Sequence, residues 1–396
     1  FFLTLLFLFP LLLQARDVEI RIKHRKQAIR SLQKALKFTG NDDRPEVMLF
    51  LANQLSDLSK AYEFKAQSLL DLIPADLSKD ERDKALQGTE KQQREIWLKA
   101  DGVAEKAVKI YALVMDRFPG SDYAKEAILF LADLYSQQDR QSKAAELYKR
   151  FSREFPKDNK LSAVYLQLGE YHFSRGDILA AEEAYKKASR LDKGQVKAYA
   201  LYKIAWCKYN LGDFGLSRKL FGAVIKNFSH LIAEKDRNNF LLRAIGDYAL
   251  SLSENHMGDE AEALLSSELP EGLFNLAMSQ LSKVYLKQGK HEDAWLVLDR
   301  IPLQKLNPKD QVELCFTKME AALKLKVTKQ FSRQNKMLRA ILTRYKDYKP
   351  EYEKGAKLRE WALYYHKLYK KSGRSSDYEL AKESYLSLAQ LFVSLK

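Results

Sequence analysis

A spacing of twelve residues between small side chains recurs four times along the sequence. In each case a small residue is followed twelve positions later by another, and four positions after that by an aromatic residue or leucine. Small side chains at two such places let antiparallel helices approach closely, and the larger residue fills the space beside them. Each occurrence therefore predicts a helix, a short turn and a second helix. The positions are Ala132, Ala144 and Tyr148; Gly169, Ala181 and Tyr185; Ala205, Ser217 and Phe221; and Ser282, Ala294 and Leu298.

The segments between the paired small residues carry a turn signature. With these turns, and with Phe-Pro pairs at 118–119 and 155–156, the pattern resembles the tetratricopeptide repeat (TPR) family, whose units are about 34 residues long. The resemblance is specific from 103 to 228, weaker from 273 to 302 and weakest elsewhere. It implies an all-α fold, a right-handed α-solenoid of TPR-like helix-turn-helix repeats. The turn residues are Gly176-Asp177, Gly212-Asp213 and Gly289-Lys290.

Glycine and proline are scarce throughout the chain. The 16 Gly and 9 Pro among 396 residues are about half the average share, which excludes collagen-like and Gly/Pro-rich disordered chains and most β-sandwiches. Outside the repeats, apolar residues spaced three and four apart predict further helices, whereas the polar stretch 76–94 predicts a connecting excursion. The expected helices cover 20–37, 45–73, 93–116, 308–326, 331–346, 351–371 and 377–395.

The first fifteen residues are apolar except for Thr4, Pro10 and Gln14. Such a run is too short to span about 30 Å of hydrocarbon but matches the apolar core of a signal peptide. We therefore expect an N-terminally truncated signal peptide at 1–15 with cleavage near Ala15; an uncleaved anchor and a buried amphipathic segment are the alternatives. No cysteine lies near this position, so no lipobox is expected. The mature chain should be periplasmic, with no transmembrane helix.

The net charge of +15 is concentrated at the two ends of the chain. Residues 16–37 hold eight Lys or Arg against two acidic residues, and residues 303–374 hold 19 against seven. The middle is therefore nearly neutral. Together with the repeat pattern, this predicts four segments: the signal peptide at 1–15, a helical N-terminal cap with divergent repeats at 16–102, a TPR solenoid at 103–302 and a basic helical C-terminal arm at 303–396.

Motifs for catalysis are absent from the sequence. It contains no Gly-rich phosphate loop, no G-x-S-x-G, no H-E-x-x-H and no C-x-x-C, and no two of its six histidines lie within one helical turn of each other. We therefore predict no enzymatic activity, no catalytic residues, no metal site and no cofactor. His172 stands at a packed seam position of the family and is expected to be a core residue. Cys207 is expected to be a small apolar filler, and with Cys315 it fits neither a disulfide scaffold nor a zinc ribbon.

One predicted helix carries four aromatic residues at spacings i, i+3, i+7 and i+10, which places them on one face. The resemblance implies that the family's concave peptide-binding face is built from such first-helix positions. The alternative is that these rings pack against the first helices of neighbouring repeats. The family's carboxylate clamp is not reproduced, so a chaperone-type clamp is not expected. The predicted groove residues are Phe173, Tyr199, Tyr202, Trp206, Tyr209 and Asn210.

The C-terminal arm combines basic residues with tyrosines. In an exported protein, the acidic partners that suit such a surface are anionic lipid headgroups, cell-wall polymers or an acidic protein, whereas nucleic acid is not expected as a partner. The alternative is a solvated lysine-rich face whose tyrosines serve helix packing. The predicted basic surface consists of Arg333, Lys336, Arg339, Arg344, Lys346, Lys349, Lys357 and Arg359.

These features together predict a non-enzymatic TPR scaffold or adaptor of the bacterial cell envelope. The Phe-Pro repeat ends look similar to those of outer-membrane assembly, cell-division coordinator and envelope motility-complex TPR proteins. The expected partner is a protein, bound as a peptide or helix of an envelope complex. The alternative is a lipid- or wall-polymer-attaching module in which the basic arm binds and the repeats act as a spacer. The oligomeric state is not predicted.

Overall fold

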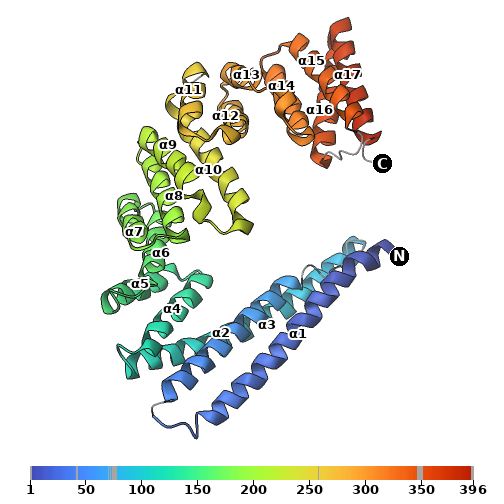
Figure 1. Ribbon diagram of the computed structural model, residues 1–396. Helices are drawn as coiled ribbons and strands as arrows, with labels where there is room; N and C mark the ends of the chain where they lie inside the picture. Colours follow the sequence, from blue (N-terminus) through green and yellow to red (C-terminus); the bar gives the residue numbers. More distant parts are fainter. Residues whose placement is uncertain are drawn as a thin grey trace. The chain divides into compact units, whose positions relative to one another are not determined.

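The computed structural model describes residues 2–41, 43–69, 71, 73, 78–256, 258–345 and 351–393, with side chains from residue 17 onward except at 352 and 393. Within these residues every regular element is a helix (Figure 1), which confirms the predicted all-α TPR solenoid class. The chain divides into two units, residues 1–191 and 192–396. No helix in the described ranges is long and apolar enough to span a membrane.

The first unit contains three long helices followed by two shorter pairs. Helix α2 packs against both α1 and α3, α3 packs against α4, and α5 packs against α6. The pairs α4–α5 and α6–α7 are the first two predicted repeats. The side chains of the predicted signal peptide lie outside the described residues. The helices are α1 (Phe2–Ala35), α2 (Arg44–Ser68), α3 (Lys79–Arg117), α4 (Asp122–Gln137), α5 (Gln141–Glu154), α6 (Leu161–Ser174) and α7 (Ile178–Leu191).

The second unit continues the alternation of paired helices. Helices α8–α9, α12–α13, α14–α15 and α16–α17 pack as pairs, and α10 packs on both α9 and α12. The last four helices match their predicted spans to within three residues. The bounds are α8 (Gln195–Asn210), α9 (Phe214–Ala223), a π-helical turn η2 (Val224–Phe228), α10 (Glu234–Asn255), α11 (Gly258–Glu268), α12 (Phe274–Lys287), α13 (His291–Asp299), α14 (Pro308–Lys324), α15 (Thr328–Arg344), α16 (Tyr352–Ser372) and α17 (Ser375–Val393).

The small residues of the repeat pattern are buried between paired helices, as predicted. At Gly169 the helices lie so close that an added Cβ would be 2.4 Å from two ring carbons of Tyr185. The buried tyrosine of the second helix is then anchored by its hydroxyl. Tyr185 donates to Glu170 at 2.8 Å, and Tyr148 donates to Asp133 at 2.9 Å. In both repeats the acceptor directly follows the small residue of the first helix.

The same backbone turn joins five of the helix pairs. Its central residue has a positive φ, and the next residue donates its N–H to the carbonyl five positions before it. Glycine adopts this conformation without steric cost, which explains the three predicted glycine turns. Two non-glycine residues take the same place. The central residues are Asp139 (φ 57°), Gly176 (79°), Gly212 (79°), Gly289 (76°) and Lys326 (59°).

Helices α14 and α15 form a repeat pair that the sequence motif does not show. Around the turn residue Lys326, the positions that hold the two small residues in the other repeats are occupied by Met319 and Phe331, and both are fully buried. Large side chains take the place of the small ones, and Phe331 packs in a cluster of rings with α16. Phe331 lies 5.8 Å from Trp361 and 5.0 Å from Tyr365 of α16. The aromatic residues of the arm therefore include core residues as well as surface ones.

One local expectation is wrong. The polar stretch 76–94 was expected to connect helices as an excursion, but α3 begins at Lys79 and runs through it. Ser78 starts the helix with a capping box, in which its backbone N–H donates to Glu81 Oε2 at 3.2 Å. A capped helix of this length tolerates a polar first half because it needs to bury only part of its surface. The predicted segment boundaries at 15, 102 and 302 stay predictions.

Candidate functional site

The four aromatic residues of α8 lie on one face, and each is half-buried. Their rings contact α9 and α10 rather than standing free. Tyr202 lies 5.4 Å from Phe221 of α9 and 5.4 Å from Phe240 of α10, and Trp206 lies 5.8 Å from Phe221. Tyr199 lies 5.3 Å from the same Phe240. The stripe therefore packs between α8 and the neighbouring helices of its own unit.

Three polar atoms of the stripe donate to two carboxylates of α10. Tyr202 donates its hydroxyl to Asp247, and Trp206 Nε1 donates to the same carboxylate at 3.2 Å. Tyr209 donates to Glu254 at 2.8 Å. Burial raises the pKa of Asp247, while the two donors act in the opposite direction. Asp247 is therefore a half-buried acceptor that orients two rings.

The other predicted groove residues have separate positions. Asn210 is exposed, and its amide donates to the Trp206 carbonyl of its own helix at 2.8 Å. Phe173 is half-buried on α6 and belongs to the first unit. The five residues of α8 thus form one continuous strip, and the binding role of the whole set stays a prediction.

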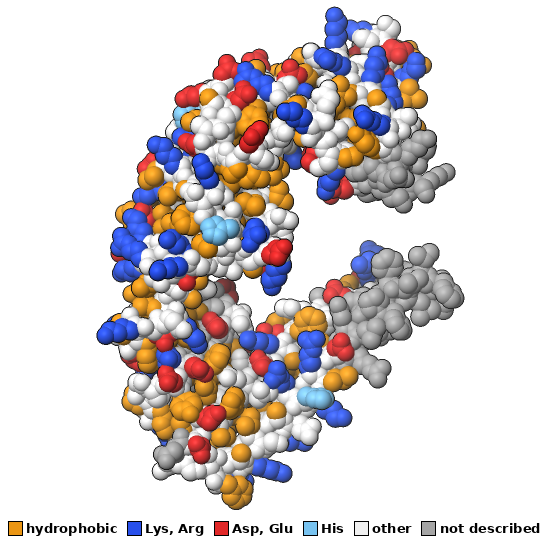
Figure 2. All heavy atoms as spheres, in the orientation of Figure 1, with side chains coloured by type: hydrophobic (Ala, Val, Ile, Leu, Met, Phe, Trp, Pro, Cys, Tyr) orange, Lys and Arg blue, Asp and Glu red, His pale blue; other side chains and the backbone are white. Residues whose placement is uncertain are grey.

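Residues of the predicted basic surface lie on two helices and do not share one role. On α15, Arg339 donates to the Glu383 carbonyl at 2.9 Å and to Ser387 Oγ at 3.3 Å, so it ties α15 to α17. Lys336 pairs with Glu383 at 3.4 Å. Figure 2 shows how Lys and Arg side chains gather over the C-terminal helices, at the upper right of the view. Part of this charge therefore serves intramolecular contacts.

The remaining basic residues differ in their contacts. Arg344 places its guanidinium 5.4 Å from the Tyr345 ring centroid, and Lys357 of α16 pairs with a glutamate of α14 at 2.7 Å. Arg333 and Arg359 are exposed and form no ion pair with any described residue. Lys346 and Lys349 lie outside the described residues.

A groove in the second unit is built from every second helix between α10 and α16. Helices α10, α12, α14 and α16 line a hollow of about 830 Å³ that is partly open to solvent. Its apolar surface comes from Leu250, Val284, Leu286 and Phe316, and most of the other lining side chains are polar or charged. The charged lining residues are Lys283, Lys287, Glu313, Glu320, Lys324, Glu351, Glu353, Lys354 and Lys357.

Glu313 is the electrostatic centre of this groove. It accepts from Lys283 of α12 at 2.7 Å and from Lys354 of α16 at 2.5 Å, so one carboxylate joins three helices. Burial alone would raise its pKa, but the two lysines outweigh burial and lower the pKa to about 2. Lys287 and Lys324 are exposed at the groove and make no ion pair among the described residues. The groove therefore offers two uncommitted positive charges beside an apolar surface.

Sequence reasoning missed this groove because its residues look ordinary in the sequence. The lining residues of α14 recur at 313, 316, 317, 320 and 324, which is the spacing of one helix face. In a sequence, a helix face of Lys, Glu and one Phe indicates a solvated surface, whereas four aromatic residues on one helix face indicate a packed or binding surface. The useful signal was that α12, α14 and α16 are each the first helix of a pair.

The structure offers no cluster for metal binding or nucleophilic chemistry in the part that it describes. No group of three or more His, Cys, Asp or Glu side chains is arranged to hold a metal ion there. Both cysteines are buried, and burial raises the pKa of Cys315 to about 12. His172 is partly exposed rather than fully buried, with Nδ1 3.6 Å from Asp177.

Stacked antiparallel helix pairs define a helical-repeat protein. Two family models, both described as tetratricopeptide repeat, match residues 162–195 and 199–230. These spans cover most of α6–α7 and of α8–α9, the second and third repeats predicted from the sequence. The chain therefore contains tetratricopeptide repeats in these residues, and such repeats are typical of protein-interaction scaffolds.

Several solved structures resemble this chain at low identity. MamA is 20% identical, and the match covers 49% of this chain and 94% of MamA with a TM-score of 0.33. YrrB, a TPR protein with an unusual peptide-binding site, is 14% identical over 55% of this chain and 98% of its own, with a TM-score of 0.35. The C-terminal part of a TPR protein from Cytophaga hutchinsonii is 12% identical over 79% and 95%, with a TM-score of 0.35. A comparison with curated proteins found no match.

Proposed function

We propose that this protein is a non-enzymatic scaffold that binds a segment of a partner protein in the groove of α10, α12, α14 and α16. The observation that carries the proposal is the groove itself, where Lys287 and Lys324 flank the apolar side chains without an ion pair among the described residues. A segment that suits it places an apolar side chain near Leu250 and Val284 and carboxylates near the two lysines. The aromatic strip of α8 would extend the binding surface toward α10.

The envelope location is part of the same proposal. It rests on the apolar run at 1–15, which matches the core of a signal peptide. The partner would then belong to an envelope complex. Fractionation of the native host tests this, because an exported chain is recovered with the periplasmic fraction and a retained one is not. Recovery with the cytoplasmic fraction would remove the envelope from the proposal and leave the groove untouched.

Site-specific photocrosslinking tests the groove. A photoreactive amino acid placed at Lys287 or Lys324 should capture the same partner in the native host. The matched controls are Glu292 and Leu296 on α13, which are exposed in the same unit but do not line the groove. Capture of identical proteins from groove and control positions, or from neither, would refute the proposal.

The captured partner then allows a quantitative test. With both proteins purified, Lys287→Glu combined with Lys324→Glu should weaken binding by about tenfold or more at low salt, because buried interfacial charges become repulsive. Helical content and the unfolding midpoint should be unchanged, since both side chains are exposed. Equal affinity of the altered and wild-type chains would show that the lysines do not face the partner.

A second candidate function is attachment to anionic lipid or wall polymer through the basic arm. It is favoured by Arg333 and Arg359, which are exposed and form no ion pair with any residue the structure describes. Charge-driven attachment should fall steeply between low and moderate ionic strength. Sedimentation with anionic vesicles or wall polymer at two salt concentrations measures this directly, with Arg333→Ser and Arg359→Ser together expected to reduce it.

A further inference from the structure

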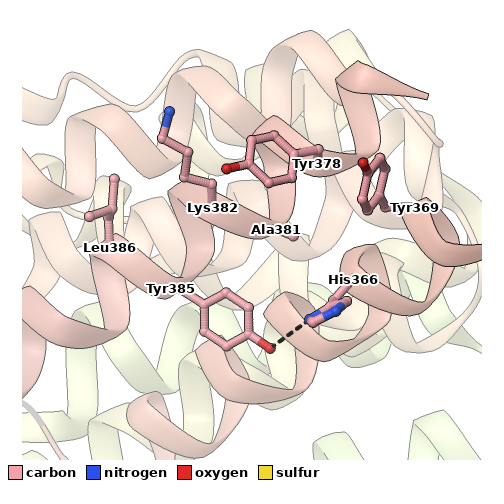
Figure 3. Close-up of a pocket in the computed structure, with 7 residues that line it drawn as sticks. All are labelled: His366, Tyr369, Tyr378, Ala381, Lys382, Tyr385 and Leu386. Carbon is pink, nitrogen blue, oxygen red and sulfur yellow. Dashed lines mark hydrogen bonds between the residues drawn. The ribbon is translucent and has the colours of Figure 1, made fainter. Parts of the chain in front are cut away.

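The last helix pair carries an apolar pocket on a face separate from the groove. Figure 3 shows aromatic side chains of α16 and α17 around a hollow of about 390 Å³. Tyr369 of α16 lies 5.5 Å from Tyr378 of α17, and His366 Nδ1 lies 3.4 Å from the Tyr385 hydroxyl. The remaining lining residues are Ala381, Lys382 and Leu386. The pocket is therefore walled by rings from both helices and is open to solvent.

The pocket lies on an apolar stripe that follows α17. Tyr378, Tyr385, Leu386 and Phe392 are 49%, 37%, 49% and 50% exposed. Their spacing of seven, eight and fourteen residues keeps them on one side of the helix over about 21 Å. In stacked helix pairs, such a face is normally covered by the next helix. The length and direction of the stripe fit a helix lying along α17 better than a single small ligand.

Positive charge gathers at one end of this stripe. Lys367, Lys370, Lys371 and Arg374 are exposed, and none forms an ion pair within the described ranges. The nearby Asp377 is buried, accepts from Ser372 at 2.5 Å and forms no ion pair with these residues in the described part of the chain. Glu379 pairs with Lys382 at 3.4 Å. A ligand that covers the stripe would therefore meet uncompensated positive charge at the end where α16 stops and α17 begins.

We propose that this face binds an amphipathic helix of another protein, with an apolar side chain inserted between Tyr378 and Tyr385 and acidic residues at the end that meets the basic cluster. A concave, ring-lined pocket accepts one inserted side chain as a hole accepts a knob. The unpaired cluster of Lys367, Lys370, Lys371 and Arg374 gives the complementary charge. This surface is distinct from the groove of the proposed function, and the two can hold different partners.

Two other occupants fit less well. A flat lipid surface would contact the exposed rings but not the hollow between them. A second copy of this chain, packed with its α17 antiparallel, would bring residues 386–393 to the basic cluster, and that segment contains no Asp or Glu. The cluster would remain unneutralised in such a dimer. Both occupants give distinct results in the experiment below.

The test uses the full chain as bait for a displayed library of random 21-residue peptides. Binders are kept only if they fail to bind the variant Tyr385→Ser with Leu386→Ser. We expect enriched peptides to show apolar residues at helical spacing and acidic residues near one end. A synthetic winner should bind about tenfold or more weakly to this variant and to Lys370→Glu with Lys371→Glu. Matched controls are Leu296→Ser and Lys226→Glu with Lys235→Glu, exposed residues of the same unit away from the pocket.

Each remaining outcome overturns the proposal. No enrichment, or enrichment of extended peptides or of helices without acidic residues, would exclude an acidic amphipathic helix. A dimer in light scattering that Tyr385→Ser with Leu386→Ser abolishes would assign the face to a second copy. Binding to anionic vesicles that the same variant abolishes, without any peptide binding, would assign it to a lipid surface. Unchanged helical content and unfolding midpoints of all variants show that the chains are folded.

Discussion

Replacing Gly169 by alanine should destabilise the first unit, although alanine is the better helix former. The added Cβ would lie 2.4 Å from Tyr185 Cδ1 and Cε1, against 3.4 Å or more in an ordinary contact. About 1 Å of movement is therefore needed, either of the ring or of α6 relative to α7. The ring cannot swing away easily, because it is fully buried and its hydroxyl is held by Glu170 at 2.8 Å.

The size of the destabilisation follows from two unfavourable contributions and one that offsets them. Overpacking a core typically costs about 1–3 kcal/mol. Loss or distortion of the hydrogen bond from Tyr185 to Glu170 adds about 1 kcal/mol. The higher helix propensity of alanine offsets about 1 kcal/mol. The net destabilisation should therefore be about 1–3 kcal/mol.

The control is the same substitution where there is space. Gly102 lies exposed inside α3, and an added Cβ would meet nothing within 4 Å, so Gly102→Ala should stabilise by about 0.5–1 kcal/mol. Urea unfolding measures both changes. Because repeat proteins can unfold in parts, hydrogen exchange in α6 and α7 should locate the effect of Gly169→Ala. If the two substitutions shift stability in the same direction and by the same amount, the close contact with Tyr185 does not limit packing.

Three further changes test other parts of the fold. Lys326→Gly should raise the unfolding midpoint and increase the free energy of unfolding by up to about 1 kcal/mol, because a lysine at φ 59° is strained where glycine is not. The pKa of Glu313 is lowered from 4.5 to about 2, so the stabilisation that this carboxylate gives is present above pH 4.5 and is lost as the pH falls toward 2. Glu313→Gln should therefore cost about 1 kcal/mol at pH 7, after discounting for solvent exposure. Near pH 2 it should cost nothing, and denaturation measured as a function of pH checks both values. Arg218→Met leaves Glu268 without its buried ion-pair partner, but Glu268 is partly exposed and still accepts from Tyr248, so the change should cost about 1–3 kcal/mol in thermal unfolding, which adding Glu268→Gln should partly restore.

The repeats could be predicted from the sequence because their determinants are local. Small residues twelve apart and a turn glycine between them specify a close helix pair, and Gly169 with Tyr185 shows the steric reason. The α14–α15 pair could not be recognised from the motif, because Met319 and Phe331 occupy the positions of the two small residues and Lys326 occupies the position of the turn glycine. The same backbone turn forms there although Lys326, at φ 59°, takes the place of glycine. The motif of small residues and a turn glycine describes one way of pairing two helices, and the fold also allows a pair with large buried side chains at those positions.

The candidate site was less predictable because its contacts are not local. The period on α8 correctly placed Tyr202 and Trp206 on one face, but their acceptor Asp247 lies more than forty positions away and has no signature in the sequence. For the same reason the groove around Glu313 could not be identified. Lysine and glutamate on a helix face specify nothing until the neighbouring helices are in place.

The position of Asp247 predicts a stability effect in the absence of any partner. Tyr202→Phe keeps the ring but removes one of two donors to this half-buried carboxylate, so it should cost about 1–2 kcal/mol. The matched control is Tyr209→Phe, whose acceptor Glu254 is exposed and can bind water instead. It should change stability by less than about 0.5 kcal/mol. Urea unfolding of the two variants gives the comparison.

A double-mutant cycle of Tyr202→Phe with Asp247→Ala measures the coupling between the two side chains. The coupling free energy should be about 1 kcal/mol or more, because the two side chains share one hydrogen bond. Equal effects of Tyr202→Phe and Tyr209→Phe, with no coupling to Asp247, would show that the hydroxyl does not hold α8 to α10. If the coupling is present, a loss of partner binding in Trp206→Ala reports damage to this helix contact as well as to any groove. Partner binding at α8 must therefore be tested with Tyr209 and Asn210, whose changes leave the contact with Asp247 in place.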